Sequence, residues 1–83
     1  MQLPNVARQR IINLARNENI KLKELSKRAN MGYSTLESFM QGKTRIITVA
    51  TLAKICDGLN IELSEFFNDK MFDDVVDEYE KKN

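Results

Sequence analysis

The sequence predicts an all-α fold, in which five short helices enclose one core and an additional amphipathic helix follows at the C-terminus. Apolar residues recur at helical spacing along almost the whole chain, and no period-two alternation lasts long enough to indicate a strand. The chain has 83 residues, of which 42% are apolar and 30% charged, as is typical of one small folded domain. Because so short a chain buries only about 60–65% of its unfolded surface, we expect marginal stability and a benefit from self-association.

The first half of the chain divides into three expected helices. Pro4 suits the first turn of a helix that ends near residues 17–19, and Gly42 is a natural C-terminal stop for the third helix. The inward positions follow helical spacing: Ala7, Ile11, Leu14 and Ala15 in the first helix, Leu22, Leu25, Ser26 and Ala29 in the second, and Leu36, Phe39 and Met40 in the third.

Two further helices are expected between residues 48 and 67. Thr48 is a good N-cap for the fourth helix, and Ser64 is the expected N-cap of a short fifth helix that ends in Phe66 and Phe67. The expected inward positions of the fourth helix are Val49, Leu52, Ala53, Ile55, Cys56 and Leu59. These five helices make residues 1–68 one expected domain, followed by an acidic tail at 69–83.

The tail has the pattern of an amphipathic helix. Its apolar residues fall at i, i+3, i+4 and i+7 and its acidic residues on the other face. Such a helix can pack against its own domain, form a dimer contact or fray, and the pattern leaves these alternatives open. If it forms a dimer contact, the expected interface residues are Phe66, Phe67, Phe72, Val75, Val76 and Tyr79.

A net charge of +1 hides a strong asymmetry along the chain. Up to Arg45 there are nine Lys and Arg residues against three acidic ones, whereas from Ile46 onward there are four Lys against nine acidic residues. A basic front of this kind offers a surface for phosphates, and an acidic back repels nucleic acid from the wrong face. Two solvated surfaces without a partner would give the same count, so charge alone does not decide.

Composition excludes most catalytic chemistry. With no His and a single Cys, the chain cannot form an intrachain disulfide, a Cys/His zinc site or an imidazole-based catalytic centre. Cys56 falls on the inward stripe of the fourth helix and is expected to be a packed thiol. The acidic tail lacks the spacing of a calcium loop, and the three glycines form no phosphate loop. We therefore expect no enzyme activity, metal or cofactor.

The N-terminus and the hydropathy pattern bear on location. Arg8 and Arg10 stand where a signal peptide needs an apolar segment, and no stretch approaches 18 apolar residues. We expect a cytoplasmic protein without a membrane partner and, in a chain of this length, without a small-molecule ligand domain.

The segment from Leu22 to Gln41 is the most specific part of the sequence. Two short helices that cross at about 90–120° need a small residue at their contact and a turn residue that tolerates a positive φ. Ser26 supplies the first, Asn30 the second, and Gly32 can cap the following helix. An αα-hairpin that merely packs has the same periodicity.

The outward-facing side chains of this segment and the residues that flank it favour a DNA contact. If Leu36 and Phe39 face the core, the outward positions of the third helix are polar or hydrogen-bonding: Tyr33, Ser34, Glu37, Ser38 and Gln41. Such groups read base edges in the major groove. Glu37 either accepts from a cytosine N4 amino group or pairs with a neighbouring Lys. Groups suited to the phosphate backbone surround this face: the cations Lys21, Lys23 and Lys27 before it, and Lys43, the hydroxyl of Thr44 and Arg45 after it.

These residues carry a resemblance to a known family. The runs LSKRAN (25–30), GYSTLESFMQGK (32–43) and ATLAKICDGLNIELSEFF (50–67) resemble the phage Cro and repressor (XRE-type) helix-turn-helix family over about residues 6–67. The resemblance implies a lambda-repressor-like five-helix bundle, a third helix in the major groove, and two-fold dimers on palindromic operators. By position, it implies base contacts from Tyr33, Ser34 and Ser38 and backbone contacts from Thr35, Gln41, Lys43 and Arg45.

The sequence departs from the family pattern in the first three helices. Leu22 stands where the family usually has a phosphate-contacting Gln, so one backbone contact is expected to be lost. Many members pair an Arg in the first helix with a Glu in the third, and the matching positions here are Ala15 and Met40. Because both partners differ together, we expect an apolar replacement of an ion pair, which need not destabilise the fold.

Two functional hypotheses follow. The first is a sequence-specific DNA-binding transcriptional regulator, a repressor, that binds an inverted-repeat operator in double-stranded DNA as a homodimer. The second is an antitoxin or anti-regulator whose tail binds a protein partner and whose DNA binding serves autoregulation. The sequence names neither the operator nor the regulated genes.

Overall fold

The computed structural model describes residues 3–43, 47–73 and 75 and shows an all-helical fold in this part of the chain. The predicted all-α class and the five helices of the bundle are confirmed. The elements in chain order are α1 (Leu3–Asn17), α2 (Leu22–Arg28), α3 (Tyr33–Met40), α4 (Val49–Gly58), α5 (Leu63–Phe67) and the 3-10 turn η1 (Lys70–Phe72).

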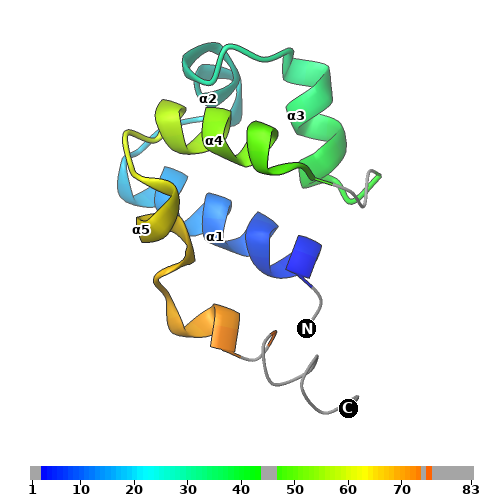
Figure 1. The fold of residues 1–83 in the computed structure, drawn as a ribbon. Helices are drawn as coiled ribbons and strands as arrows, with labels where there is room; N and C mark the ends of the chain where they lie inside the picture. Colours follow the sequence, from blue (N-terminus) through cyan, green and yellow to red (C-terminus); the bar gives the residue numbers. More distant parts are fainter. Residues whose placement is uncertain (1–2, 44–46, 74, 76–83) are drawn as a thin grey trace.

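The helices are stacked so that α2 and α3 lie at one end of the molecule and η1 at the other (Figure 1). Between these ends, α1 and α4 form the middle of the molecule. The packed pairs are α2 with α3 and α4, α4 with α5, and α1 with η1. The N-terminal helix therefore supports the last described residues of the chain.

One core joins all of these elements. Its buried members come from each helix and from the chain after α5: Val6, Ala7, Ile11, Leu25, Leu36, Phe39, Leu52, Ile55, Cys56, Leu59, Phe66, Phe72 and Val75. The side chains that touch this core while half-buried include Leu14, Ala15, Leu22 and Met40. The expected inward stripes of the first three helices therefore do meet in one core.

The first four helices end in the same way, with one residue in the left-handed conformation. These residues are Asn19, Asn30, Gly42 and Asn60, with φ between 55° and 79°. After each, a backbone N–H returns to a carbonyl five residues earlier, as in Ile20 to Ala15 at 2.9 Å and Ile61 to Cys56 at 3.0 Å. The predicted roles of Asn30 and Gly42 are thus confirmed, and Asn19 and Asn60 repeat the device.

Capping explains where α4 and α5 begin. Thr48 is extended and its hydroxyl accepts from the Thr51 N–H at 3.1 Å, which confirms the predicted N-cap of α4. The predicted cap at Ser64 is wrong, because the extended residue before α5 is Glu62 and the helix begins at Leu63. Leu63 packs against the core as the first helical residue, so the packing of its side chain outweighs the capping preference of Ser64.

Two inward positions predicted for α4 are also wrong. Val49 is 69% exposed and Ala53 is exposed, whereas Leu52, Ile55, Cys56 and Leu59 are buried. Ala53 is rotated about 100° from Leu52 around the helix axis, which puts it outside a narrow buried stripe. Val49 lies in the first turn, which the described helices do not cover.

Candidate nucleic-acid interface

α3 is held by its apolar face and displays its polar face. Leu36 is fully buried and Phe39 nearly so. On the opposite side Tyr33, Ser34 and Thr35 are exposed along the first turn. Further along, Glu37 and Ser38 are half-buried and Gln41, the C-cap residue, is exposed. The five side chains predicted to face outward, Tyr33, Ser34, Glu37, Ser38 and Gln41, therefore all retain accessible surface on α3 or its C-cap.

The turn between α2 and α3 has the geometry that the sequence predicted. Asn30 has φ 55°, and Gly32 is the extended N-cap residue of α3. Ser26 is buried at the helix contact, and its hydroxyl donates to the Lys23 carbonyl at 2.7 Å, so burial leaves this polar group bonded. The two helices are thus fixed at their junction without any side-chain cap on α3.

Cationic side chains border the same end of the molecule. Lys21, Lys23 and Lys27 are exposed on and before α2, and Lys43 is exposed just after α3. Arg28 is also exposed but pairs with Glu24 of the same helix at 3.2 Å. The predicted backbone contacts Thr44 and Arg45 lie outside the described residues. The described lysines flank the polar face of α3 in the chain, before α2 and after α3.

Glu37 has a different partner from either of the two expected ones. The Tyr33 hydroxyl donates to a Glu37 carboxylate oxygen at 3.0 Å, one helical turn apart on α3. This hydrogen bond, together with the negative charge of Glu37, raises the pKa of the Tyr33 phenol above its ordinary value. Among the described residues no Lys or Arg forms an ion pair with Glu37. The expected pairing with Lys is therefore not seen there.

Arg8 fixes the far end of α3, a role that the sequence analysis missed. Its Nε donates to the Phe39 carbonyl at 2.6 Å, and its guanidinium lies 4.9 Å from the centre of the Phe39 ring. The C-terminal turn of α3 is thereby anchored to α1. No pattern of residue types in the sequence marks this contact, because the acceptor is a backbone carbonyl 31 residues away.

Ala15 and Met40, the two positions where the resemblance implies an ion pair in many members, lie in one shallow apolar groove. Ala15 and Met40 line it together, with Ile11, Ile12, Arg16, Ile20 and Leu22. Both residues therefore occupy one apolar environment between α1, α2 and the end of α3. Leu22 faces this groove, in keeping with its place on the apolar stripe.

The predicted dimer residues separate into buried and exposed sets. Phe66, Phe72 and Val75 are buried in the chain's own core, so they offer little surface to a partner. Phe67 is 41% exposed and stacks edge-on against Phe66 and Phe72. Val76 and Tyr79 lie outside the described residues. The dimer contact thus stays a prediction, and Phe67 is the member of this set that is available to test it.

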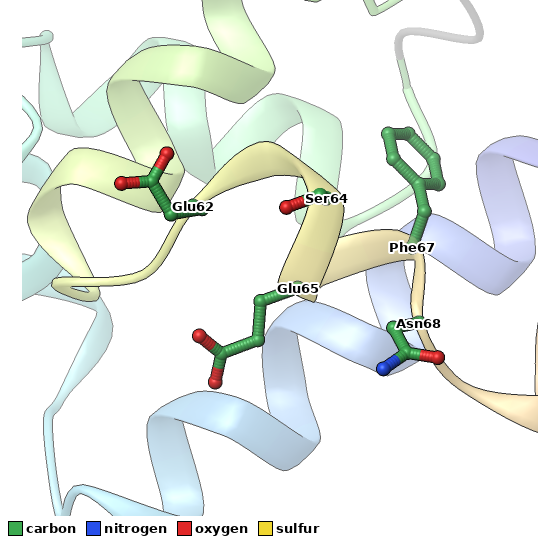
Figure 2. Close-up of a pocket in the computed structure, with 5 residues that line it drawn as sticks. All are labelled: Glu62, Ser64, Glu65, Phe67 and Asn68. Atoms are coloured by element: carbon green, nitrogen blue, oxygen red, sulfur yellow. The ribbon is translucent and has the colours of Figure 1, made fainter.

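Phe67 borders an open hollow on α5. Figure 2 shows the five residues that line it, with two carboxylates among them: Glu62, Ser64, Glu65, Phe67 and Asn68. Aromatic side chains are enriched at protein contacts, so the exposed Phe67 ring is the lining residue most suited to one. This hollow belongs to α5 and the residues beside it, at a distance from α2 and α3 (Figure 1).

Other chemistry finds no support in the described part of the chain. Cys56 is a buried free thiol whose pKa is raised by desolvation, an effect that the nearby Arg10 charge partly opposes. No group of three His, Cys, Asp or Glu side chains in residues 3–43 and 47–73 could hold a metal ion. None of the described helices has the length and apolar character needed to cross a bilayer.

Comparisons with known proteins place this geometry in a family. Neither the curated proteins nor the solved structures include a match to the chain. The family described as Cro/C1-type HTH DNA-binding domain matches residues 10–70, which covers α2 to α5 and most of α1. The matched span includes every residue of the α2–turn–α3 unit described above. The chain belongs to the Cro/C1-type helix-turn-helix DNA-binding family.

Proposed function

We propose that the chain is a sequence-specific transcriptional regulator, a repressor, that inserts α3 into the major groove of double-stranded DNA. The observation that carries this proposal is the polar, accessible face of α3 with exposed lysines before α2 and after α3. A helix presented in this way fits the major groove, whose base edges carry a distinct donor and acceptor pattern for each base pair. Repression requires only that the bound protein occludes a promoter.

The side chains divide by task. Tyr33, Ser34 and Ser38, with Glu37, are proposed to contact bases because they lie on the accessible face of α3. Backbone contacts are assigned to the exposed groups at the edge of this face and to two residues outside the described part: Lys21, Lys23, Thr35, Gln41, Lys43, Thr44 and Arg45. Since DNA is the proposed partner, we place the protein in the cytoplasm with it.

A two-fold homodimer on an inverted repeat completes the proposal. One such domain contacts roughly 600–1,000 Å² of DNA, which gives limited selectivity against a genome. Two copies related by a two-fold axis would read half-sites about 34 Å apart. The exposed Phe67 ring belongs to α5, which lies away from α3 in Figure 1, so it can take part in this contact without covering the DNA-binding face.

Selection of binding sites from random duplex DNA, followed by gel-shift titration, tests DNA recognition. Ser34→Ala or Ser38→Ala should lose about 1–3 kcal/mol on the selected site and almost nothing on random DNA. Lys43→Ala should weaken both kinds of DNA alike and reduce the salt slope by about one. Equal losses on both DNAs for the serine variants would contradict the base-reading assignment.

Sedimentation equilibrium tests the dimer. Phe67→Ser should shift the protein toward the monomer and weaken binding to the inverted repeat more than to a half-site. Val49→Ser is the matched control, because it removes an even more exposed apolar side chain from α4. A dimer that Phe67→Ser leaves unchanged would move the interface to another surface.

The alternative is an antitoxin or anti-regulator that binds another protein. The exposed Phe67 ring with Glu62 and Glu65 beside it favours a protein contact of some kind, and a second copy is only one possible occupant. Absence of any gel shift at low salt, with the chain folded, would favour this alternative. A shift on the upstream region of its own gene is compatible with both functions.

A further inference from the structure

Tyr33 and Glu37 form a hydrogen-bonded pair on the face of α3 that is proposed to meet DNA. The pair joins two consecutive turns, with the phenol as donor and one carboxylate oxygen as acceptor at 3.0 Å. Tyr33 is exposed and Glu37 half-buried, so both groups are accessible at this face. Among the described residues, this is the hydrogen bond that joins two side chains of α3 to each other.

The bond leaves the pair with acceptors and no free proton. A carboxylate has about four lone-pair positions on two oxygens, and the phenol proton occupies one of them. The phenol oxygen keeps its own lone pairs. The raised pKa of Tyr33 agrees with a proton that is held in this bond. A ligand that meets this pair must therefore donate hydrogen bonds to it.

A negative charge on a DNA-facing surface needs a specific reason to be tolerated. No described Lys or Arg pairs with Glu37, so its charge is not neutralised by the protein in this part of the chain. Phosphates would repel it, and the N7 and O6 acceptors of guanine offer it no proton. In the major groove the donors are the amino groups of cytosine and adenine, and cytosine N4 is the usual partner of a carboxylate.

We propose that Glu37, positioned by Tyr33, makes this protein select a cytosine at one position of each half-site. The proposal rests on the proposed function, because it concerns the same face of α3. Glu37 accepts from the N4 amino group, and it excludes guanine at that position since two acceptors would then face each other. Tyr33 acts as a positioning residue that restricts the Glu37 rotamer and so lowers the entropy lost when the base is bound.

Site selection with the wild-type chain and with Glu37→Gln provides the main test. The wild-type half-site should contain one cytosine position that changes to adenine in Glu37→Gln, because a glutamine amide suits adenine N6 and N7. The wild-type preference for cytosine over adenine there should fall by about 10-fold or more. The other positions of the half-site should keep their bases.

Tyr33→Phe tests the positioning role. Removal of the phenol oxygen should reduce the preference for cytosine about 3- to 10-fold without changing the preferred base. In Tyr33→Phe/Glu37→Gln the base preference at that position should equal that of Glu37→Gln alone. A purely structural role would instead lower the affinity for all sequences together.

Glu24→Gln is the matched control, because it also removes one negative charge from an exposed partner pair, here on α2. It should leave the selected site unchanged. An unchanged site with Glu37→Gln, or a wild-type half-site that contains only A·T and T·A pairs, would overturn this inference while leaving DNA recognition in place. Failure to select any sequence with the folded wild type would overturn the proposed function itself.

Discussion

The two ends of the molecule use polar groups in opposite ways. At the reading end, residues 21–43, most outward side chains of α2 and α3 are exposed and their side-chain hydrogen bonds to each other are local, one turn apart, while Arg8 of α1 contacts Phe39 from outside. At the aromatic end, residues 62–75, three phenylalanine rings pack together and one guanidinium ties distant segments. Arg10 donates there to the Phe66 carbonyl at 2.8 Å, the Glu65 carbonyl at 2.9 Å and the Asp69 carboxylate at 3.2 Å.

This difference indicates which polar groups stabilise the fold and which remain available to bind a partner. At the aromatic end the Arg10 guanidinium is bonded to three groups of the chain itself, so it stabilises the fold and has little capacity left for a ligand. Polar groups at the reading end keep most of their hydrogen-bonding capacity, so they contribute little to folding and are free to contact a partner. Substitutions should therefore affect stability at one end and binding at the other.

The largest expected effect is at Phe72. Phe72→Ala should lower the free energy of unfolding by about 3–5 kcal/mol, because the ring is buried against Phe66 and Phe67. Phe67→Ala should lose less than half as much, since the Phe67 ring is 41% exposed. Urea unfolding followed by circular dichroism measures both. Similar losses for the two variants would show that the exposed fraction of a ring does not determine its contribution to stability here.

Arg10→Ala should have the next largest effect, about 2–3 kcal/mol in the free energy of unfolding. The side chain of Arg10 is only 13% exposed, and its removal leaves the Glu65 and Phe66 carbonyls without this donor. Arg16→Ala, in the exposed last turn of α1, should change stability by less than about 0.5 kcal/mol. Equal changes in the free energy of unfolding for Arg10→Ala and Arg16→Ala, measured by urea titration, would contradict a stabilising role for the Arg10 bonds.

Gly58→Ala should lower stability by about 1–2 kcal/mol. A methyl group at Gly58 would lie 3.0 Å from the Ala29 backbone nitrogen and 3.1 Å from Leu25, where α4 approaches α2. Gly32→Ala is the matched control at the reading end, because the nearest atom there is 3.6 Å away. It should lose less than about 1 kcal/mol. Thermal unfolding of the pair would show whether the α2–α4 contact is as rigid as these distances imply.

At the reading end itself, Ser34→Ala should change the free energy of unfolding by less than about 0.5 kcal/mol. The side chain is exposed and has no described hydrogen-bond partner. The same variant is expected to weaken binding to the selected DNA, so stability and binding would be separated in one substitution. A loss above 1 kcal/mol in the free energy of unfolding would show that Ser34 contributes to the stability of the fold and not only to DNA binding.

The smallest effect concerns the ionisation of Tyr33. Because Glu37 raises the pKa of this phenol, the proton is held more tightly in the folded chain than in the unfolded one. The contribution of this bond is therefore complete below the ordinary tyrosine pKa and is lost as the pH rises through the raised value. In alkaline titration followed by tyrosinate absorbance, Glu37→Gln should move one transition to lower pH. An unchanged titration would mean that the bond is not populated in solution.

Much of the fold could be predicted because its signals are local. Helical spacing identified the core faces of α1 to α3, Thr48 marked the start of α4, and Asn30 and Gly42 marked two helix ends. The misplaced features depend on neighbours that are distant in sequence. Ser64 has the better capping side chain, but the burial of Leu63 decides where α5 begins.

The outward face of α3 could be predicted from the sequence, whereas the side chains that hold the helices in place could not. The outward face of α3 follows from the burial of Leu36 and Phe39, which periodicity already indicated. The roles of Arg8 and Arg10 could not be predicted, because each bonds to backbone carbonyls 31 to 56 residues away. A backbone carbonyl has no sequence identity, so no pattern of residue types announces such a contact.

The bonds from Arg10 to the aromatic end also have a consequence for biosynthesis. Because α1 is synthesised before residues 65–75, it cannot complete its packing until they are present: the Arg10 guanidinium bonds to Phe66 and the apolar face of α1 packs near Phe72. Closing this loop of more than 50 residues carries an entropic cost that the contacts of Arg10 and the aromatic end have to offset. A chain that stopped before residue 65 would lack these contacts and leave the apolar face of α1 partly uncovered.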